Sequence, residues 1–256
     1  MTTLIHCYHH SRGYFDFVSS TISLSEKFPN YNITWAVPER RAITQVLQFP
    51  NTELFEVPSI TFHNSMAEKP EINEQGYNKF QEQISLLQPA TCIYVDFRKG
   101  RSLEYPEQFR PMVAIKPEIS EQIRDSIIKT LGNRYEVIHV RTGDKELYKG
   151  EKTNLAKWYV AIEKYLATTS NPCCLISDSL TLKNNMRDKL HCSDVIPFHS
   201  GRSKNIEDAM PFAIDVVTIQ NAFKCQAFSN PNHNTAFSRV PAHYAGVPYN
   251  NSYVMD

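Results

Sequence analysis

The chain has 256 residues, 41% of them hydrophobic, which is enough for one large domain or two modest ones with full cores. Lysine plus arginine and aspartate plus glutamate each number 27, which argues against a general nucleic-acid or membrane-surface binder. A neutral chain can still hold a local basic pocket for a phosphorylated small molecule. Nowhere do about 18 apolar residues run together, so no membrane span is expected.

Six cysteines are scattered along the chain, and none forms a C-x-x-C pair, so neither a zinc site nor a redox pair is expected. Most lie in apolar, strand-like runs, which is typical of small core residues in a reducing compartment. The N-terminal residues lack a basic region followed by a long apolar run, so no signal peptide is expected. These features favour a cytoplasmic protein.

The first half of the chain alternates short apolar runs with helical patterns. Strands are predicted at 4–8, 33–37, 52–57 and 92–97, and helices at 15–28, 39–48 and 77–87. A polar turn with a single glycine, Gly13, separates the first strand from the first helix. This is the opening of a Rossmann-like unit, but it lacks the three glycines of a dinucleotide-binding fingerprint.

The second half repeats the alternation more regularly. Helices are predicted at 117–131, 154–168, 182–190, 207–223 and 236–245, and strands at 137–140, 173–176, 195–198 and 226–229. Strand–helix alternation with short connections means a parallel, doubly wound sheet with right-handed crossovers. We therefore predict an α/β protein of two Rossmann-like domains, residues 1–112 and 113–256, with the boundary in a proline-bearing stretch near 111–117.

Three predicted strands of the second half end in polar residues. The clusters are His139, Arg141 and Asp144; Ser177, Asp178 and Ser179; and residues 229–235. Because the carboxyl ends of parallel strands share one edge of a sheet, we expect the three clusters to face a common crevice, where ligands bind. An arginine in such a place suits a phosphate, since its fork of donors matches phosphate oxygens two at a time.

Each cluster also has a purely structural interpretation. Arg141 could form an ion pair with Asp144 that only closes the turn. Asp178 could cap the following helix, a role that serine and aspartate fill well. Residues 229–235 could be a plain loop, whereas the functional alternative is an anion site of small donors before a helix N-terminus.

The segment 139–145, H-V-R-T-G-D-K, resembles the H-x-R-x-x-D segment of the fucosyltransferases that use GDP-fucose, the α1,2, α1,6 and protein O-linked groups. Residues 213–239 are similar to the segment of that family in which an aspartate-bearing helix leads to a strand, a Ser/Thr-rich turn and another helix. The run Ala236-Phe237-Ser238-Arg239 resembles most the nodulation-type α1,6 enzymes. The resemblance covers about residues 115–245.

This resemblance implies a GT-B glycosyltransferase, in which two Rossmann-like domains face a cleft. The N-terminal domain would lie on the acceptor side and bind a glycan, and the C-terminal domain would bind GDP-fucose or a related nucleotide sugar. The same resemblance implies that Arg141 contacts the β-phosphate, with His139 near the nucleotide and Asp144 in the same segment.

Further donor-binding residues follow from the resemblance. Asp178, with Ser179 beside it, would lie by the guanine or the ribose, and Asp215 would support the pocket. The diphosphate would be held by the turn formed by Asn234, Thr235, Ala236, Phe237 and Ser238. Two features depart from the family: Thr142 stands where the α1,2 and α1,6 enzymes have a second arginine, and the chain is shorter than the usual two-domain enzyme.

Transfer from a nucleotide sugar requires stabilisation of a departing diphosphate, either by a metal on an Asp-x-Asp motif or by arginines and helix N-termini. The sequence contains no D-x-D, so we expect metal-independent, inverting transfer with no cofactor. The acidic pair Asp144 and Glu146 is the alternative metal site. A non-catalytic protein that binds a nucleotide sugar or a glycan, or a transferase that uses another nucleotide sugar, remains an alternative function.

Inverting transfer also needs a base for the acceptor hydroxyl. His10 and Asp16, after the first predicted strand, are the catalytic candidates beside Arg141, and His9 and Asp96 are further ones. The structural alternative is a surface turn for the two histidines and a favourable helix N-terminal charge for Asp16.

Overall fold

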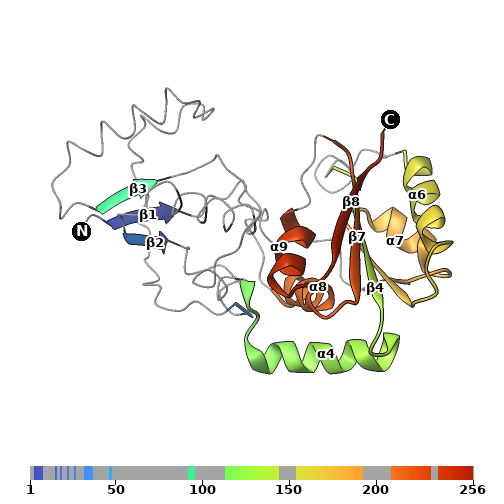
Figure 1. The fold of residues 1–256 in the computed structure, drawn as a ribbon, viewed down its shortest axis with the longest axis horizontal. Coiled ribbons are helices and arrows are strands. Elements are labelled where there is room, and N and C mark those ends of the chain that lie inside the picture. Colours follow the sequence, from blue (N-terminus) through green and yellow to red (C-terminus); the bar gives the residue numbers. More distant parts are fainter. Residues whose placement is uncertain are drawn as a thin grey trace. The chain divides into compact units, whose positions relative to one another are not determined.

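The computed structural model describes residues 113–143, 154–192, 209–231 and 236–255, together with short stretches of the first half (3–7, 15, 18, 22, 26, 32–36, 46–47 and 92–95). The chain divides into two compact units (Figure 1), one of residues 1–112 with 201–207 and the other of residues 113–200 with 208–256. No helix within the described ranges is both long and apolar enough to cross a membrane.

The first unit contains a parallel sheet of three strands in the order β2-β1-β3. The strands are β1 (Thr3–Cys7), β2 (Asn32–Ala36) and β3 (Cys92–Val95), and β1 pairs in parallel with both neighbours. Three of the predicted strands are therefore confirmed to within two residues at each end. Phe15, Val18 and Ile22 are helical and buried, at the spacing of one helix face, as the pattern over 15–28 predicts. The predicted strand at 52–57 and helix at 77–87 lie outside the described residues, and of 39–48 only Val46 and Leu47 are described.

The second unit contains a parallel sheet of five strands in the order β6-β5-β4-β7-β8. Along the chain its elements are α4 (Pro117–Leu131), β4 (Glu136–Arg141), α6 (Ala156–Leu166), β5 (Cys173–Ser177), α7 (Leu180–Met186), β6 (His191–Cys192), α8 (Met210–Gln220), β7 (Lys224–Ser229), α9 (Ala236–Tyr244) and β8 (Tyr249–Tyr253). The predicted α/β alternation is confirmed in this unit, and α4 has the predicted bounds. Pro117 occupies its first turn, and Gly132, at φ 77°, ends it with an N–H that donates to the Ile128 carbonyl.

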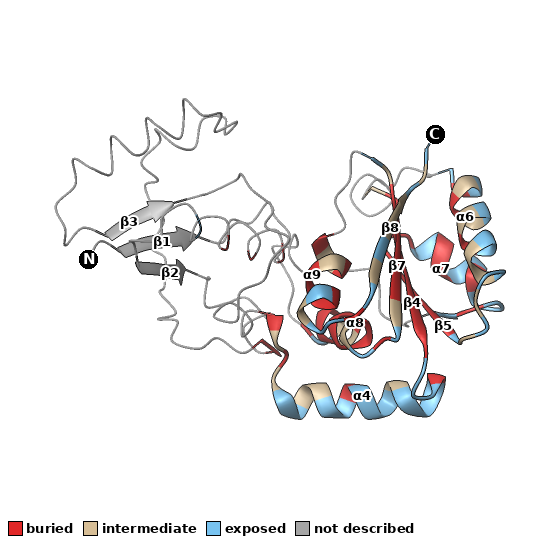
Figure 2. Cartoon of the chain, viewed as in Figure 1, coloured by how far each residue is buried: buried red, intermediate tan, exposed pale blue. Residues whose placement is uncertain are grey.

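Helices cover both faces of this sheet, and each face has its own core. Ile138 and Val140 of β4 point toward α6 and α7, where they pack with Trp158, Ile162 and Leu182. Val137 of β4 points to the opposite face, packing in a second cluster with Leu131, Ile219 and Ala242 of α4, α8 and α9. Because side chains alternate along a strand, His139 and Arg141 share the face of Val137. Figure 2 shows the central strands buried, while α4 exposes most of its surface.

Two details of the second unit differ from the sequence prediction. The helix predicted at 182–190 spans Leu180–Met186 and is followed by the short strand β6, whereas the strand predicted at 195–198 lies outside the described residues. The edge strand β8 was not predicted, because Y-N-N-S-Y carries no apolar alternation. Its polar side chains are held by hydrogen bonds instead: Asn250 donates to the Gln226 side chain, and Gln226 donates to Ser252.

Candidate functional site

The carboxyl end of β4 places a buried arginine next to a buried carboxylate. The Arg141 side chain is 8% exposed and that of Asp178 is fully buried, and 3.4 Å separates Nη1 of Arg141 from Oδ2 of Asp178. Asp178 follows β5, which pairs with β4 in parallel, so the two residues meet at adjacent strand ends. The prediction that these two strand ends share an edge is confirmed. The Arg141–Asp144 ion pair stays untested because Asp144 lies outside the described residues.

Asp178 also fixes the backbone that follows Arg141. Its Oδ1 accepts from the Thr142 N–H at 2.6 Å and from the Thr142 hydroxyl at 3.0 Å, and its Oδ2 accepts from the Gly143 N–H at 3.0 Å. A carboxylate that receives several such donors is a rigid anchor, since each charge-assisted bond restrains both partners. The arginine and the turn after it are therefore oriented by one side chain.

The residue that caps α7 is Ser179, and the interpretation of Asp178 as the cap is wrong. The Ser179 hydroxyl accepts from the Leu182 N–H at 3.1 Å, which is the usual N-cap geometry. The helix begins at Leu180, and this places serine at the cap while leaving the aspartate to face β4. Contacts of Asp178 and Ser179 with guanine or ribose stay predictions.

His139 joins β4 to the first turn of α9. Its Nδ1 lies 2.7 Å from the Ser238 hydroxyl, its ring lies 5.8 Å from that of Phe237, and Ser238 lies 3.5 Å from the Tyr249 hydroxyl of β8. The first turn of α9 thus contacts β4 through Phe237 and Ser238, whereas residues 232–235 of the predicted third cluster lie outside the described residues. Nε2 of His139 is buried and has no hydrogen-bond partner among the described residues. Burial is the main cause that lowers the pKa of His139, to about 4. The carboxylate of Asp178 raises this pKa, and the positive charge of Arg141 lowers it.

The lowered pKa of His139 predicts a pH dependence of the free energy of unfolding. An unfolded histidine titrates near 6.5, so between about pH 7 and pH 4 the unfolded chain gains a proton at His139 that the folded chain does not. The free energy of unfolding should therefore fall on acidification, by about 3 kcal/mol from this residue. Denaturant unfolding at pH 7, 6, 5 and 4 measures it. His139→Gln, which cannot titrate, should lose that part of the dependence, and equal slopes for the two proteins would contradict the prediction.

The remaining predicted residues fall into two groups. Ala236 begins α9 and is buried, the Phe237 ring packs against Phe212 of α8 at 6.0 Å, and Asp215 is buried on α8. The other group lies outside the described residues: His10, Asp16, Asp144, Asn234 and Thr235. Their roles stay predictions.

The comparisons with known proteins bear on the fold. No protein-family model matches the chain, and neither does any curated protein sequence. Among solved structures it is similar to NodZ α-1,6-fucosyltransferase soaked with GDP-fucose, at 17% identity and a TM-score of 0.55, with 95% of this chain and 91% of that chain covered. Selenomethionine NodZ from Bradyrhizobium is similar at 17% identity and a TM-score of 0.54, with 94% of this chain and 91% of that chain covered. POFUT1 in complex with GDP-fucose is similar at 10% identity and a TM-score of 0.51, with 98% of both chains covered.

The chain has the fold of these fucosyltransferases. The likeness extends over nearly the whole of each chain, so it includes both units and not only the part that carries Arg141. The site described above thus stands at the carboxyl edge of a sheet in a fold that NodZ and POFUT1 share.

The chemistry that the described residues offer at this edge is anion binding. They supply a guanidinium, the N-terminal turn of α9 with its backbone donors, and a buried imidazole. Within the described ranges no group of three His, Cys, Asp or Glu side chains could hold a metal ion. Oxyanions with two or three adjacent oxygens fit such a donor set, and phosphate esters are the common biological example.

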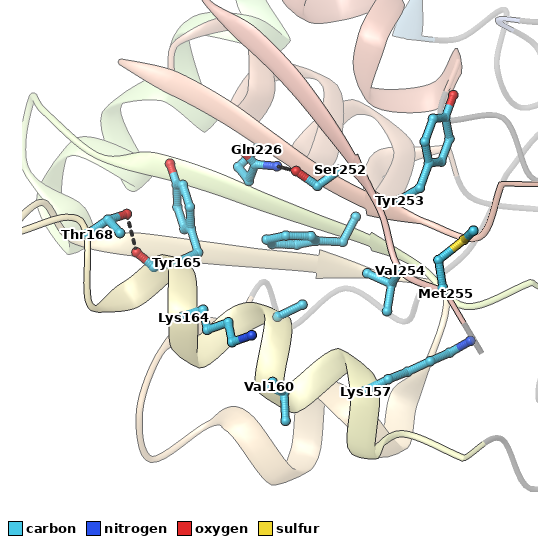
Figure 3. Close-up of a pocket in the computed structure, with 12 residues that line it drawn as sticks. Lys157, Val160, Lys164, Tyr165, Thr168, Gln226, Ser252, Tyr253, Val254 and Met255 are labelled. Atoms are coloured by element: carbon cyan, nitrogen blue, oxygen red, sulfur yellow. Dashed lines mark hydrogen bonds between the residues drawn. The ribbon is translucent and has the colours of Figure 1, made fainter.

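A separate groove of about 460 Å³ lies on the other face of the same sheet, between α6 and β8 (Figure 3). Phe228 and Val254 are among the apolar residues that line it, and Lys157 and Lys164 lie along the α6 side. None of the predicted site residues lines it. The groove therefore offers lysines whose removal can serve as controls for charge.

Proposed function

We propose that the protein is a glycosyltransferase that transfers fucose from GDP-fucose to a glycan acceptor. The observation that carries the proposal is the buried Arg141, held by Asp178 at the carboxyl end of β4 beside His139 and Ser238. Support comes from the fold shared with NodZ, whose crystals were soaked with GDP-fucose, and with POFUT1, which was crystallised with GDP-fucose. The two units would be the two Rossmann-like domains of a GT-B enzyme, with the donor bound by residues 113–256.

In this mechanism the bond between the anomeric carbon of fucose and the β-phosphate oxygen breaks while an acceptor hydroxyl attacks that carbon from the opposite face. Arg141 and the amides at the start of α9 stabilise the negative charge that develops on the departing diphosphate. The acceptor proton passes to a base, for which His10 and Asp16 are the candidates from the sequence. Because the site supplies a guanidinium and a helix N-terminus for the leaving group, the transfer is proposed to be metal-independent.

The test is a single-turnover assay of the purified protein with GDP-fucose, alone and with a panel of oligosaccharides. We expect slow release of GDP and fucose without acceptor, faster GDP release with a suitable glycan, and no change on addition of EDTA. Thermal shifts at equal nucleotide concentration should rank GDP above UDP, since a ligand that binds more tightly raises the melting temperature further. A protein that binds GDP-fucose but never cleaves it would be a binding protein, and a preference for UDP would refute the assigned donor.

A further inference from the structure

Arg239, in the first turn of α9, has two guanidinium nitrogens that are not satisfied within the described part of the protein. Nε and Nη2 are both buried and have no hydrogen-bond partner there. No ion pair links the residue to a carboxylate among the described residues either. The residue as a whole is partly exposed, but buried polar atoms in proteins are nearly always paired, so two unpaired nitrogens on one side chain require an explanation. A ligand that supplies oxygen acceptors would explain why this charge is retained.

The position of Arg239 places it beside the site already described. The preceding residue, Ser238, lies 2.7 Å from Nδ1 of His139, and His139 precedes Arg141 by two residues on the same face of β4. His139 is fully buried, and its Nε2 is a second nitrogen in this region with no hydrogen-bond partner among the described residues. Two unsatisfied donor-bearing groups from different elements therefore flank one contact between β4 and α9.

The direction of the side chain follows from its neighbours on the helix. Phe237 packs on Phe212 of α8, and Ser238 faces β4 and β8, so a further rotation of about 100° turns Arg239 toward the β8 side of α9. His243, one turn later on that side, packs its ring 5.8 Å from Tyr249 of β8. Side chains on a helix tilt toward its N-terminus. The N-terminus of α9 follows the carboxyl end of β7, so this tilt is toward the carboxyl edge of the sheet, the edge at which β4 ends with Arg141.

The charge at this edge calls for a second cation. A nucleoside diphosphate carries more than one negative charge, whereas the end of β4 supplies one guanidinium, since Thr142 is uncharged and its hydroxyl donates to Asp178. We propose that Arg239 is a phosphate-binding residue that holds the diphosphate of the donor from the α9 side, while Arg141 holds it from the β4 side. This inference rests on the proposed function, and it adds a residue and a binding geometry to it.

The test measures GDP binding by calorimetry to the wild type, Arg239→Met and Arg239→Lys, with Arg141→Ala for comparison. Methionine keeps much of the apolar stem and removes the charge. We expect Arg239→Met to weaken GDP binding by about 10- to 100-fold, the range for loss of one charge-assisted contact. Lysine should recover part of the affinity, because it restores the charge without the fork. Lys164→Ala, which removes an exposed lysine beside the groove on the other sheet face, is the matched control and should bind GDP as the wild type does.

A second readout separates ligand binding from a structural role. If Arg239 serves the ligand, the ligand-free Arg239→Met protein should melt at the wild-type temperature or above it, because two unsatisfied buried donors have been removed. A fall of melting temperature together with affinity would overturn the inference, since Arg239 would then be holding the fold. GDP binding unchanged in Arg239→Met but lost in Arg141→Ala would also overturn it and leave the proposed function standing. A wild type that binds no GDP would remove both.

Discussion

Replacement of Arg141 by alanine should lower kcat for GDP-fucose turnover by about 100- to 1000-fold, the usual cost of removing one preorganised group that stabilises a developing oxyanion. The side chain is almost fully buried and is anchored by Asp178, so it is oriented before the donor arrives. Such preorganisation is what makes an electrostatic contact effective in the transition state. The loss should therefore appear in kcat as well as in the affinity for GDP. Timed assays of GDP release measure kcat, and calorimetry measures the affinity.

Two further variants make this result interpretable. Arg141→Lys keeps the charge but not the planar fork, so its activity should lie between those of the wild type and Arg141→Ala. Arg124→Ala removes an arginine of α4 whose side chain is 48% exposed, and it should leave turnover unchanged. Arg141→Ala should still fold, because Asp178 keeps its three hydrogen bonds from Thr142 and Gly143, and circular dichroism checks this. Normal turnover by a folded Arg141→Ala protein would refute the role assigned to Arg141.

The parts of the fold that the sequence predicted best are those with a strong local signal. The helix α4 has a proline in its first turn and a glycine after its last residue, and its bounds are as predicted. The strand β4 is a run of β-formers interrupted by His139 and Arg141, and both residues lie where the pattern placed them. The edge strand β8 is not predicted by the sequence pattern. It is held by side-chain hydrogen bonds to Gln226 and by pairing with β7, and neither depends on local periodicity.

The site was predictable as a neighbourhood and not as a set of contacts. Chain order indicated that the ends of β4, β5 and β7 share an edge, but it did not indicate which strands are adjacent. The Arg141–Asp178 pair depends on β5 lying next to β4, a tertiary fact. The choice between Asp178 and Ser179 as the N-cap of α7 requires the first residue of the helix to be known. The sequence does not give it, because serine and aspartate are equally good caps. The sequence presents Arg239 only as part of a motif, since the absence of a hydrogen-bond partner is visible only in three dimensions.

The second large effect is expected from Asp178→Asn. The amide would keep an oxygen for the Thr142 donors, but its NH₂ would face the Gly143 N–H and the Arg141 guanidinium, placing donors against donors. Breaking a buried pair by removing one partner costs about 3 kcal/mol or more, so the free energy of unfolding should fall by that order. GDP-fucose turnover should fall by about 100-fold, because Arg141 loses its orientation. Thr142→Val, which removes only the hydroxyl that Asp178 accepts, is the matched control and should retain most of the activity.

The same variant distinguishes a positioning residue from one that contacts the nucleotide base. If Asp178 acts only through Arg141, its replacement should weaken GDP and UDP by the same factor and leave their ratio unchanged. Asp178→Asn should then have little further effect on GDP binding in an Arg141→Ala background, since residues that act through one contact are not additive. The family resemblance implies a place for Asp178 by the guanine or the ribose. If Asp178 binds guanine, the GDP-to-UDP ratio should collapse and the effects of the two substitutions should add. Four donors to the Asp178 carboxylate, namely the Thr142 N–H, the Thr142 hydroxyl, the Gly143 N–H and the Arg141 guanidinium, come from Arg141 and the turn that follows it, which is why we expect the first result.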